Sequence, residues 1–170
     1  LYFGLEMKSG YENSVAQKWW EFDISCFGHR AIMNNVTAAM AIEQFKKLPD
    51  YMKKRARVHN FYDEHLSKIS WIDTPPTLPD DWTTSYYFYH IQVKNGKRDE
   101  LAKFLREHDI YTTYRYFPLH RVKKYGVSGV FPGADYATDN TLCLPLHQSL
   151  SDDDLETVTT KIKEFNDRFC

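Results

Sequence analysis

A proline-rich stretch divides the sequence into two parts of different character. Residues 73–81 read DTPPTLPDD, and each proline fixes φ and lacks a backbone amide donor, so regular structure is not expected to continue through them. This is the only break in composition, and the 170 residues contain no internal repeat or low-complexity segment. We therefore predict a linker at 73–81 between a first part, residues 1–72, and a second part, residues 82–170.

The first part is predicted to be a helical arm. Asn34 and Asn35 can cap a helix with apolar residues at helical spacing, and Pro49 suits the first turn of a second helix. One side of that second helix would carry Met52, His59, Tyr62 and Leu66. Another side is basic and is expected to be solvated, with Lys53, Lys54, Arg55 and Arg57.

The second part is predicted to be a small α/β sandwich. Residues 86–93 are rich in β-formers, Asn95-Gly96 favours a turn, and a helix follows whose spaced apolar residues are Leu101, Phe104, Leu105 and His108. A strand is expected at 110–116, a long loop at 118–139 and a short strand at 141–144. A capping box, Ser151 with Asp154, starts a last helix that buries Leu155, Val158, Ile162 and Phe165.

Charge and cysteine content exclude several classes of protein. Lys and Arg number 22 against 23 Asp and Glu, so no overall field attracts polyanions and any phosphate contact has to be local. The widely spaced cysteines, Cys26, Cys143 and Cys170, argue against a disulfide scaffold or a zinc ribbon. No apolar run is long enough for a membrane span, and the first residues lack the pattern of a signal peptide. We expect a cytoplasmic protein that contacts neither membrane nor nucleic acid.

Two segments place cations where anions bind well. Arg115 and His120 lie where the predicted strand 110–116 runs into the long loop, and the planar fork of an arginine grips phosphate or carboxylate. Arg30 lies just before the predicted helix start at Asn35, where backbone amides and the helix dipole favour a phosphate. The structural interpretation also stands: Arg115 pairs with a surface carboxylate, His120 packs against the loop, and the glycine turn only caps the helix.

Other chemistry finds little support. The spacing of His108, His120 and His147 does not match a metal site, so no metal is predicted, although His147 could lie near the same loop. Cys26 and Cys143 are expected to be small core residues. The phosphate-binding and nucleophile motifs G-x-x-x-x-G-K-[ST], G-x-G-x-x-G and G-x-S-x-G do not occur.

Taken in order, several blocks of the sequence resemble the C-terminal half of the DegT/DnrJ/StrS family of pyridoxal-phosphate-dependent sugar aminotransferases. The resembling blocks are Trp20–Asp23, Gly28–Ala39, Glu43–Gln44, Arg57, Tyr62, Tyr111–His120, Leu144–His147 and Leu150–Ser151. They extend over essentially the whole chain. The resemblance implies the C-terminal part of a fold-type I aminotransferase, in which residues 1–72 end the large domain and supply the interdomain helices. Residues 82–170 would then be the small domain.

The resemblance also implies roles for individual residues. Arg30, with Asn35, matches the position that reaches the cofactor phosphate of the other subunit of a homodimer. Arg115 matches a position that faces the substrate or amino donor, and Tyr116 and His120 belong to the same block. Ala31 and Ile32 depart from the family, where an aromatic and a polar residue are common, which puts the cross-subunit contacts in doubt.

The residues that perform the family's chemistry are absent from the sequence. These are the lysine of the Schiff base, the carboxylate that pairs with the pyridine nitrogen, and the glycine-rich segment near the lysine. We therefore predict no catalytic residue in this chain, and a pyridoxal phosphate bound mainly by residues outside it, such as a missing N-terminal half. The implied reaction passes an amino group, with glutamate as the expected donor, to a keto-sugar nucleotide.

A different class of function remains open at this stage. The aromatic segments 86–89 and 111–117 could form a stacking platform for nucleotides or single-stranded RNA. The near-neutral charge weighs against it, because no basic stripe would follow a phosphate backbone. A non-catalytic assembly module is the related alternative.

Overall fold

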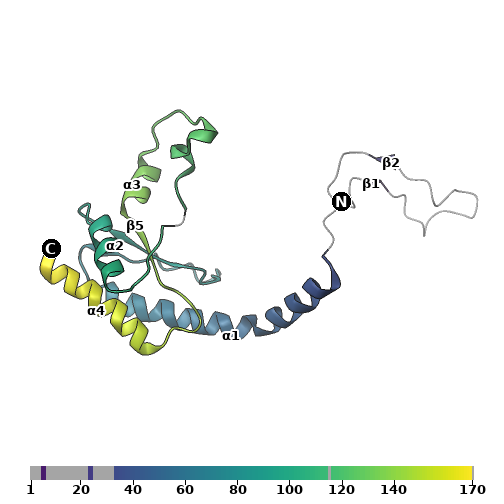
Figure 1. The fold of residues 1–170 in the computed structure, drawn as a ribbon, viewed down its shortest axis with the longest axis horizontal. Coiled ribbons are helices and arrows are strands. Elements are labelled where there is room, and N and C mark those ends of the chain that lie inside the picture. The colour runs from purple at the N-terminus through teal and green to yellow at the C-terminus, as the bar shows by residue number, and fades with distance from the viewer. Residues whose placement is uncertain (1–4, 7–22, 25–32, 115, 170) are drawn as a thin grey trace, which may run out of the picture. The chain divides into compact units, whose positions relative to one another are not determined.

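The computed structural model describes residues 5–6, 23–24, 33–114 and 116–169 (Figure 1). Contacts between residues divide the chain into two units, Leu1–Lys46 and Lys47–Cys170. The first unit contains two short antiparallel strands, β1 (Leu5–Glu6) and β2 (Asp23–Ile24), and the start of helix α1. The predicted domain boundary at 73–81 stays a prediction.

Helix α1 is a single helix, Asn35–Leu66, where the sequence predicts two. Asn34 caps it as expected, because its Oδ1 accepts a hydrogen bond from the backbone N–H of Thr37 at 2.9 Å. The prediction that Pro49 begins a second helix is wrong: Pro49 lies inside α1. Its fixed φ is helical, so it removes one backbone hydrogen bond while the turns on either side keep theirs.

A three-stranded antiparallel sheet forms the centre of the second unit. Its order is β3 (Ile72–Asp73), β4 (Tyr89–Val93) and β5 (Thr141–Leu144), and Tyr89 pairs with Leu144 in the register. β4 begins later than predicted, because Tyr86 has a φ of 46°, which is not extended backbone.

The predicted strand at 110–116 is wrong. Among the described residues of this stretch, 110–114 and 116, only Thr113 pairs with the sheet, through one bridge to Cys143. Tyr111 and Tyr116 are exposed, and the β-propensity of such residues depends on packing against a half-buried pleated surface that they do not have here.

Helices α2 (Arg98–Glu107) and α4 (Asp152–Phe169) form where the sequence predicts them. The turn before α2 has positive φ at Asn95 and Gly96, 60° and 69°, a conformation that these two residue types tolerate. The capping box of α4 is present: the backbone N–H of Asp154 donates to Ser151 Oγ at 3.1 Å, and that of Ser151 donates to Asp154 Oδ2 at 2.9 Å.

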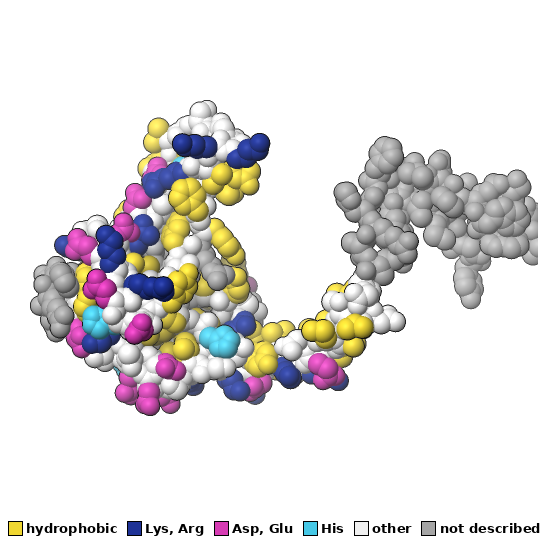
Figure 2. Space-filling model, in the orientation of Figure 1, with side chains coloured by type: hydrophobic (Ala, Val, Ile, Leu, Met, Phe, Trp, Pro, Cys, Tyr) yellow, Lys and Arg dark blue, Asp and Glu magenta, His cyan; other side chains and the backbone are white. Residues whose placement is uncertain are grey.

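The predicted loop at 118–139 contains helices that the sequence does not predict. They are η1 (Leu119–Arg121), η2 (Lys123–Tyr125) and α3 (Pro132–Asn140). Pro132 occupies the first turn of α3, where its missing amide is not needed. We refer to residues 117–140 as the α3 excursion; it appears at the top of Figure 1 and carries exposed apolar and basic side chains in Figure 2.

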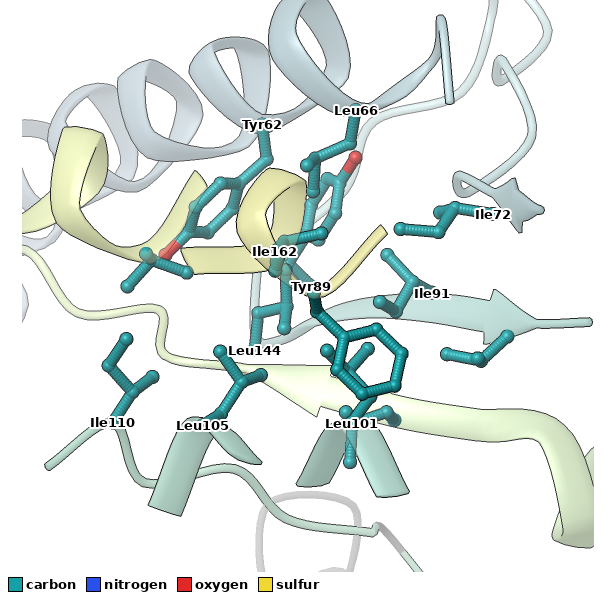
Figure 3. Packing of buried hydrophobic residues seen from close by; sticks show 14 of the residues in the cluster. Tyr62, Leu66, Ile72, Tyr89, Ile91, Leu101, Leu105, Ile110, Leu144 and Ile162 are labelled. Atoms are coloured by element: carbon teal, nitrogen blue, oxygen red, sulfur yellow. The ribbon is translucent and has the colours of Figure 1, made fainter. Parts of the chain in front are cut away.

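The core of the second unit lies between one face of the sheet and three helices (Figure 3). Alternate residues of β4 are buried, which directs Tyr89, Ile91 and Val93 to this face. The helices contribute Val58, Tyr62 and Leu66 from α1, Leu101, Phe104 and Leu105 from α2, and Leu155, Val158, Ile162 and Phe165 from α4. His90 and Cys143, which pair in the register, are therefore left to the other face, and the chain after α2 runs beside β5, where Thr113 pairs with Cys143.

Candidate functional site

The residues implied for the cofactor lie at the start of α1. Arg30 lies outside the described residues. Asn35 is the first residue of the helix and is exposed, and it is Asn34 that caps the first turn. The structure thus leaves Asn35 free to meet a group beyond the described residues.

The residues implied for the substrate lie where the chain leaves the sheet for the α3 excursion. Arg115 lies outside the described residues. Tyr116 is 70% exposed. His120 is half-buried and points to α3 rather than to open solvent: its Nε2 lies 2.9 Å from Asp135 Oδ1, and its ring centroid lies 5.2 Å from that of Phe131.

An ion-pair network holds the α3 excursion together. The guanidinium of Arg121 donates to Asp135 at 2.6 Å and to Asp139 at 3.0 Å, and these two carboxylates lie one helical turn apart on α3. The hydrogen bond from His120, followed by that from Arg121, lowers the pKa of Asp135 below its ordinary value. His120 and Arg121 therefore fix the segment that follows Tyr116.

The segment after β5 is fastened to α1 near both of its ends. The hydroxyl of Tyr62 donates to the carbonyl of Pro145 at 2.8 Å. On the same helix as Tyr62, the guanidinium of Arg57 donates to the carbonyl of Leu150 and to the carboxylate of Asp152. Residues 145–150 are held in this way across the end of the sheet, beside Thr113.

A cavity of about 350 Å³ opens at this point; we call it the strand-end cavity. It is lined by Arg55 of α1, by residues 87–88 just before β4, by Tyr111 and Thr113, and by residues 143–148. His147 thus lies beside the chain that leads to the excursion. The ring nitrogen Nδ1 of His147 accepts the backbone N–H of Ser149 at 3.2 Å, so in neutral His147 the proton is on Nε2.

A second cavity, of about 640 Å³, lies between α1, the segment 74–78 and the segment 84–88. Asp63 accepts a hydrogen bond from the Tyr89 hydroxyl at 2.7 Å and lies 3.1 Å from His59 Nδ1. Burial, then this hydrogen bond, raises the pKa of Tyr89. The sequence analysis places His59 on the apolar side of its helix and assigns it to no site. The spacing of four residues between His59 and Asp63 could have predicted their contact on one helix face.

The described residues do not form a complete pyridoxal phosphate site. A Schiff-base lysine has to be desolvated, and every described lysine is exposed or half-buried, several of them in ion pairs on helix surfaces. Within the described ranges, no group of three His, Cys, Asp or Glu residues could hold a metal ion. None of the described helices is long and apolar enough to cross a membrane.

The aromatic platform considered for nucleic acid does not form as two adjacent strands. Tyr89 is buried in the core, and residues 110–114 make only the single bridge at Thr113. Tyr87, Tyr111 and Tyr116 are exposed, and none of the three lies in a strand.

This architecture is that of the C-terminal part of a fold-type I aminotransferase. The crystal structure of the aminotransferase TlmJ from Streptoalloteichus hindustanus superimposes with a TM-score of 0.81 and 42% identity, covering 91% of this chain and 42% of that one. The profile of the DegT/DnrJ/EryC1/StrS aminotransferase family matches residues 4–163. The chain belongs to this family, which confirms the resemblance seen in the sequence.

Two curated relatives match most of this chain. The dTDP-4-dehydro-2,3,6-trideoxy-D-glucose 4-aminotransferase of Saccharopolyspora spinosa is 39% identical over 96% of this chain and 43% of its own length. The spore coat polysaccharide biosynthesis protein SpsC of Bacillus subtilis is 29% identical over 92% of this chain and 43% of its own length. The chain thus spans less than half the length of these relatives.

Proposed function

We propose that the chain is the C-terminal portion of a pyridoxal-phosphate-dependent aminotransferase that transfers an amino group from glutamate to a keto-sugar nucleotide. The family match over residues 4–163 carries the proposal. The name of the Saccharopolyspora spinosa relative, a 4-aminotransferase of a dTDP-linked dehydro sugar, supports a nucleotide-sugar substrate.

The chain's share of the work is to bind and position. In this proposal Arg30 and Asn35 bind the cofactor phosphate of the other subunit of a homodimer. Arg115 and Tyr116 contact the substrate. His120 acts indirectly, because its hydrogen bond with Asp135 holds the segment after Tyr116 against α3. The Schiff-base lysine and most of the cofactor's contacts would come from an N-terminal half outside this chain. We propose a cytoplasmic location for the assembled enzyme.

The test is to purify the native protein that contains these residues and to measure its intact mass, its visible absorption and amino transfer. The assay uses L-glutamate with a 4-keto sugar linked to a nucleoside diphosphate. We expect a mass above 20.1 kDa or a second polypeptide, cofactor absorption, and transfer. A lone 20.1 kDa species without absorption or transfer would overturn the proposal and favour the assembly module.

A further inference from the structure

Arg55 differs from two other arginines of the second unit, Arg57 and Arg121. It lies on α1, half-buried, at the wall of the strand-end cavity. Arg57 and Arg121 each hold carboxylates. By contrast, Arg55 has neither a hydrogen bond nor an ion pair to any of the residues that the structure describes. A guanidinium presents five donors in a rigid fork, so this one is available to an acceptor that enters the cavity.

Gln148, in the lining of the same cavity, has a hydrogen-bond acceptor without a donor. Its Oε1 is buried and receives no hydrogen bond from the described residues. A buried acceptor without a donor is unfavourable, and native structures rarely leave one unmatched. The cavity therefore presents a cationic donor without a partner, and a buried neutral acceptor without a partner lies in its wall.

The remaining lining favours a small anion with an apolar or sugar-like body. None of the described lining residues is acidic. Tyr111 forms one wall, and the guanidinium of Arg106 lies 5.4 Å from its ring centroid, which steadies a ring that is otherwise exposed. Tyr87 and Phe88 form another wall, and their rings meet edge to face at 5.7 Å.

We propose that the strand-end cavity is a substrate subsite in which Arg55 binds an anionic oxygen group and Gln148 accepts a hydrogen bond from the same molecule. The group is a carboxylate or a phosphate. The assignment to a substrate rests on the proposed function, which offers both sources: the amino donor brings carboxylates and an ammonium, and the sugar nucleotide brings a diphosphate and hydroxyls. In this proposal Arg55 is a specificity residue.

Ligand binding to the 170-residue chain tests the subsite directly. Isotope-labelled chain is titrated with L-glutamate and, separately, with thymidine 5′-diphosphate, while the signals of Arg55, Thr113 and Gln148 are followed by NMR. We expect saturable shifts with at least one probe. Arg55→Gln should weaken that binding about tenfold or more, as for loss of charged hydrogen bonds, and Arg55→Lys should weaken it less.

Two further variants control for charge and folding. Lys53→Gln removes the same charge from an exposed site on the same helix and should leave the dissociation constant unchanged. Gln148→Leu should weaken binding without lowering the stability of the free chain, because the amide oxygen that it removes is unmatched. Retained signal dispersion shows that each variant is folded.

The outcomes separate the sources and the two proposals. A response to glutamate alone assigns the carboxylate, a response to the nucleotide alone assigns the phosphate, and both probes competing assigns a shared subsite. Absence of saturable shifts, or shifts that Arg55→Gln leaves unchanged, overturns the subsite. Amino transfer by the native protein is measured separately, so transfer without binding at Arg55 removes only the subsite, and binding without transfer removes only the proposed function.

Discussion

The hydroxyl of Tyr62, on α1, donates a hydrogen bond of 2.8 Å to the backbone carbonyl of Pro145, just beyond β5. This bond joins the core helix to the segment that closes the strand-end cavity. Burial raises the pKa of Tyr62, so the phenol stays protonated and remains a donor at all ordinary pH values. The position of residues 145–148 therefore depends on a core residue.

Tyr62→Phe tests that dependence. It keeps the ring in the core, removes the donor, and leaves the carbonyl of Pro145 without its partner. We expect a loss of about 1 kcal/mol in the free energy of unfolding, measured with urea. Tyr51→Phe, on the same helix and with no side-chain hydrogen bond among the described residues, should change the stability by less than about 0.5 kcal/mol. Equal effects from the two variants would show that the Pro145 bond contributes nothing.

The network of Asp135 makes the α3 excursion sensitive to acid. Its pKa is lowered in the folded chain, so the unfolded chain binds protons more readily at low pH. The stabilisation is complete above the ordinary carboxyl pKa of about 3.9 and is lost as pH falls through the lower folded value. We expect the helical Cα shifts of residues 132–140, followed by NMR, to decline only after the pH has fallen below the ordinary carboxyl pKa of about 3.9.

Asp135→Asn should remove this acid sensitivity and weaken α3 at neutral pH, because His120 and Arg121 lose their shared acceptor. Asp80→Asn, at an exposed site with no side-chain partner among the described residues, is the control and should leave the acid transition in place. An unchanged transition in Asp135→Asn would mean that other carboxylates hold the excursion.

Ser151 tests how much the capping box contributes to the second unit. Its Oγ accepts the backbone N–H of Asp154 at 3.1 Å and donates to the Asp154 carboxylate at 2.7 Å. Ser151→Ala should cost about 1 kcal/mol of unfolding free energy in urea titrations. Ser149→Ala, exposed two residues earlier, should cost little. A cost as large for Ser149 would point to the segment before α4 rather than to its cap.

Local signals predicted the parts of the fold that local forces determine. The capping box of α4, the spacing of Leu101, Phe104 and Leu105 in α2, and the Asn95-Gly96 turn each act within a few residues, and each is present. Helix α3 escaped prediction because Gly133 and three Asp or Asn residues favour loops. The residue that stabilises it, Arg121, lies outside α3 in η1. It contacts Asp135 and Asp139 only because the chain turns back between η1 and α3.

The candidate site shows the same division. The sequence pointed to the strand end at 114–120 and to the block at 144–147. Residues 144–147 line the strand-end cavity together with Tyr111 and Thr113, whereas none of the described residues of 114–120 lines it. The sequence alone could not identify Arg55 as a site residue, because Arg55 belongs to a basic run with Lys53 and Lys54 that is expected to be solvated. Only the packing of α1 against residues 145–150, through Tyr62 and Arg57, turns Arg55 toward the strand-end cavity.

Pro49 provides the last test, because it interrupts the hydrogen bonding of a helix that continues past it. Pro49 has no N–H to donate to the carbonyl of Phe45, and proline inside a helix costs about 3 kcal/mol relative to alanine. Pro49→Ala removes this cost from the folded chain. The gain in stability is partly offset, because the unfolded chain recovers conformational entropy worth up to about 1 kcal/mol. We therefore expect the variant to be about 2 kcal/mol more stable in urea, with slower amide exchange around residue 49. Lys47→Ala, at an exposed site two residues before Pro49, should change the free energy of unfolding by less than about 0.5 kcal/mol. A loss of stability in Pro49→Ala would instead show that the second unit depends on proline at this position of α1.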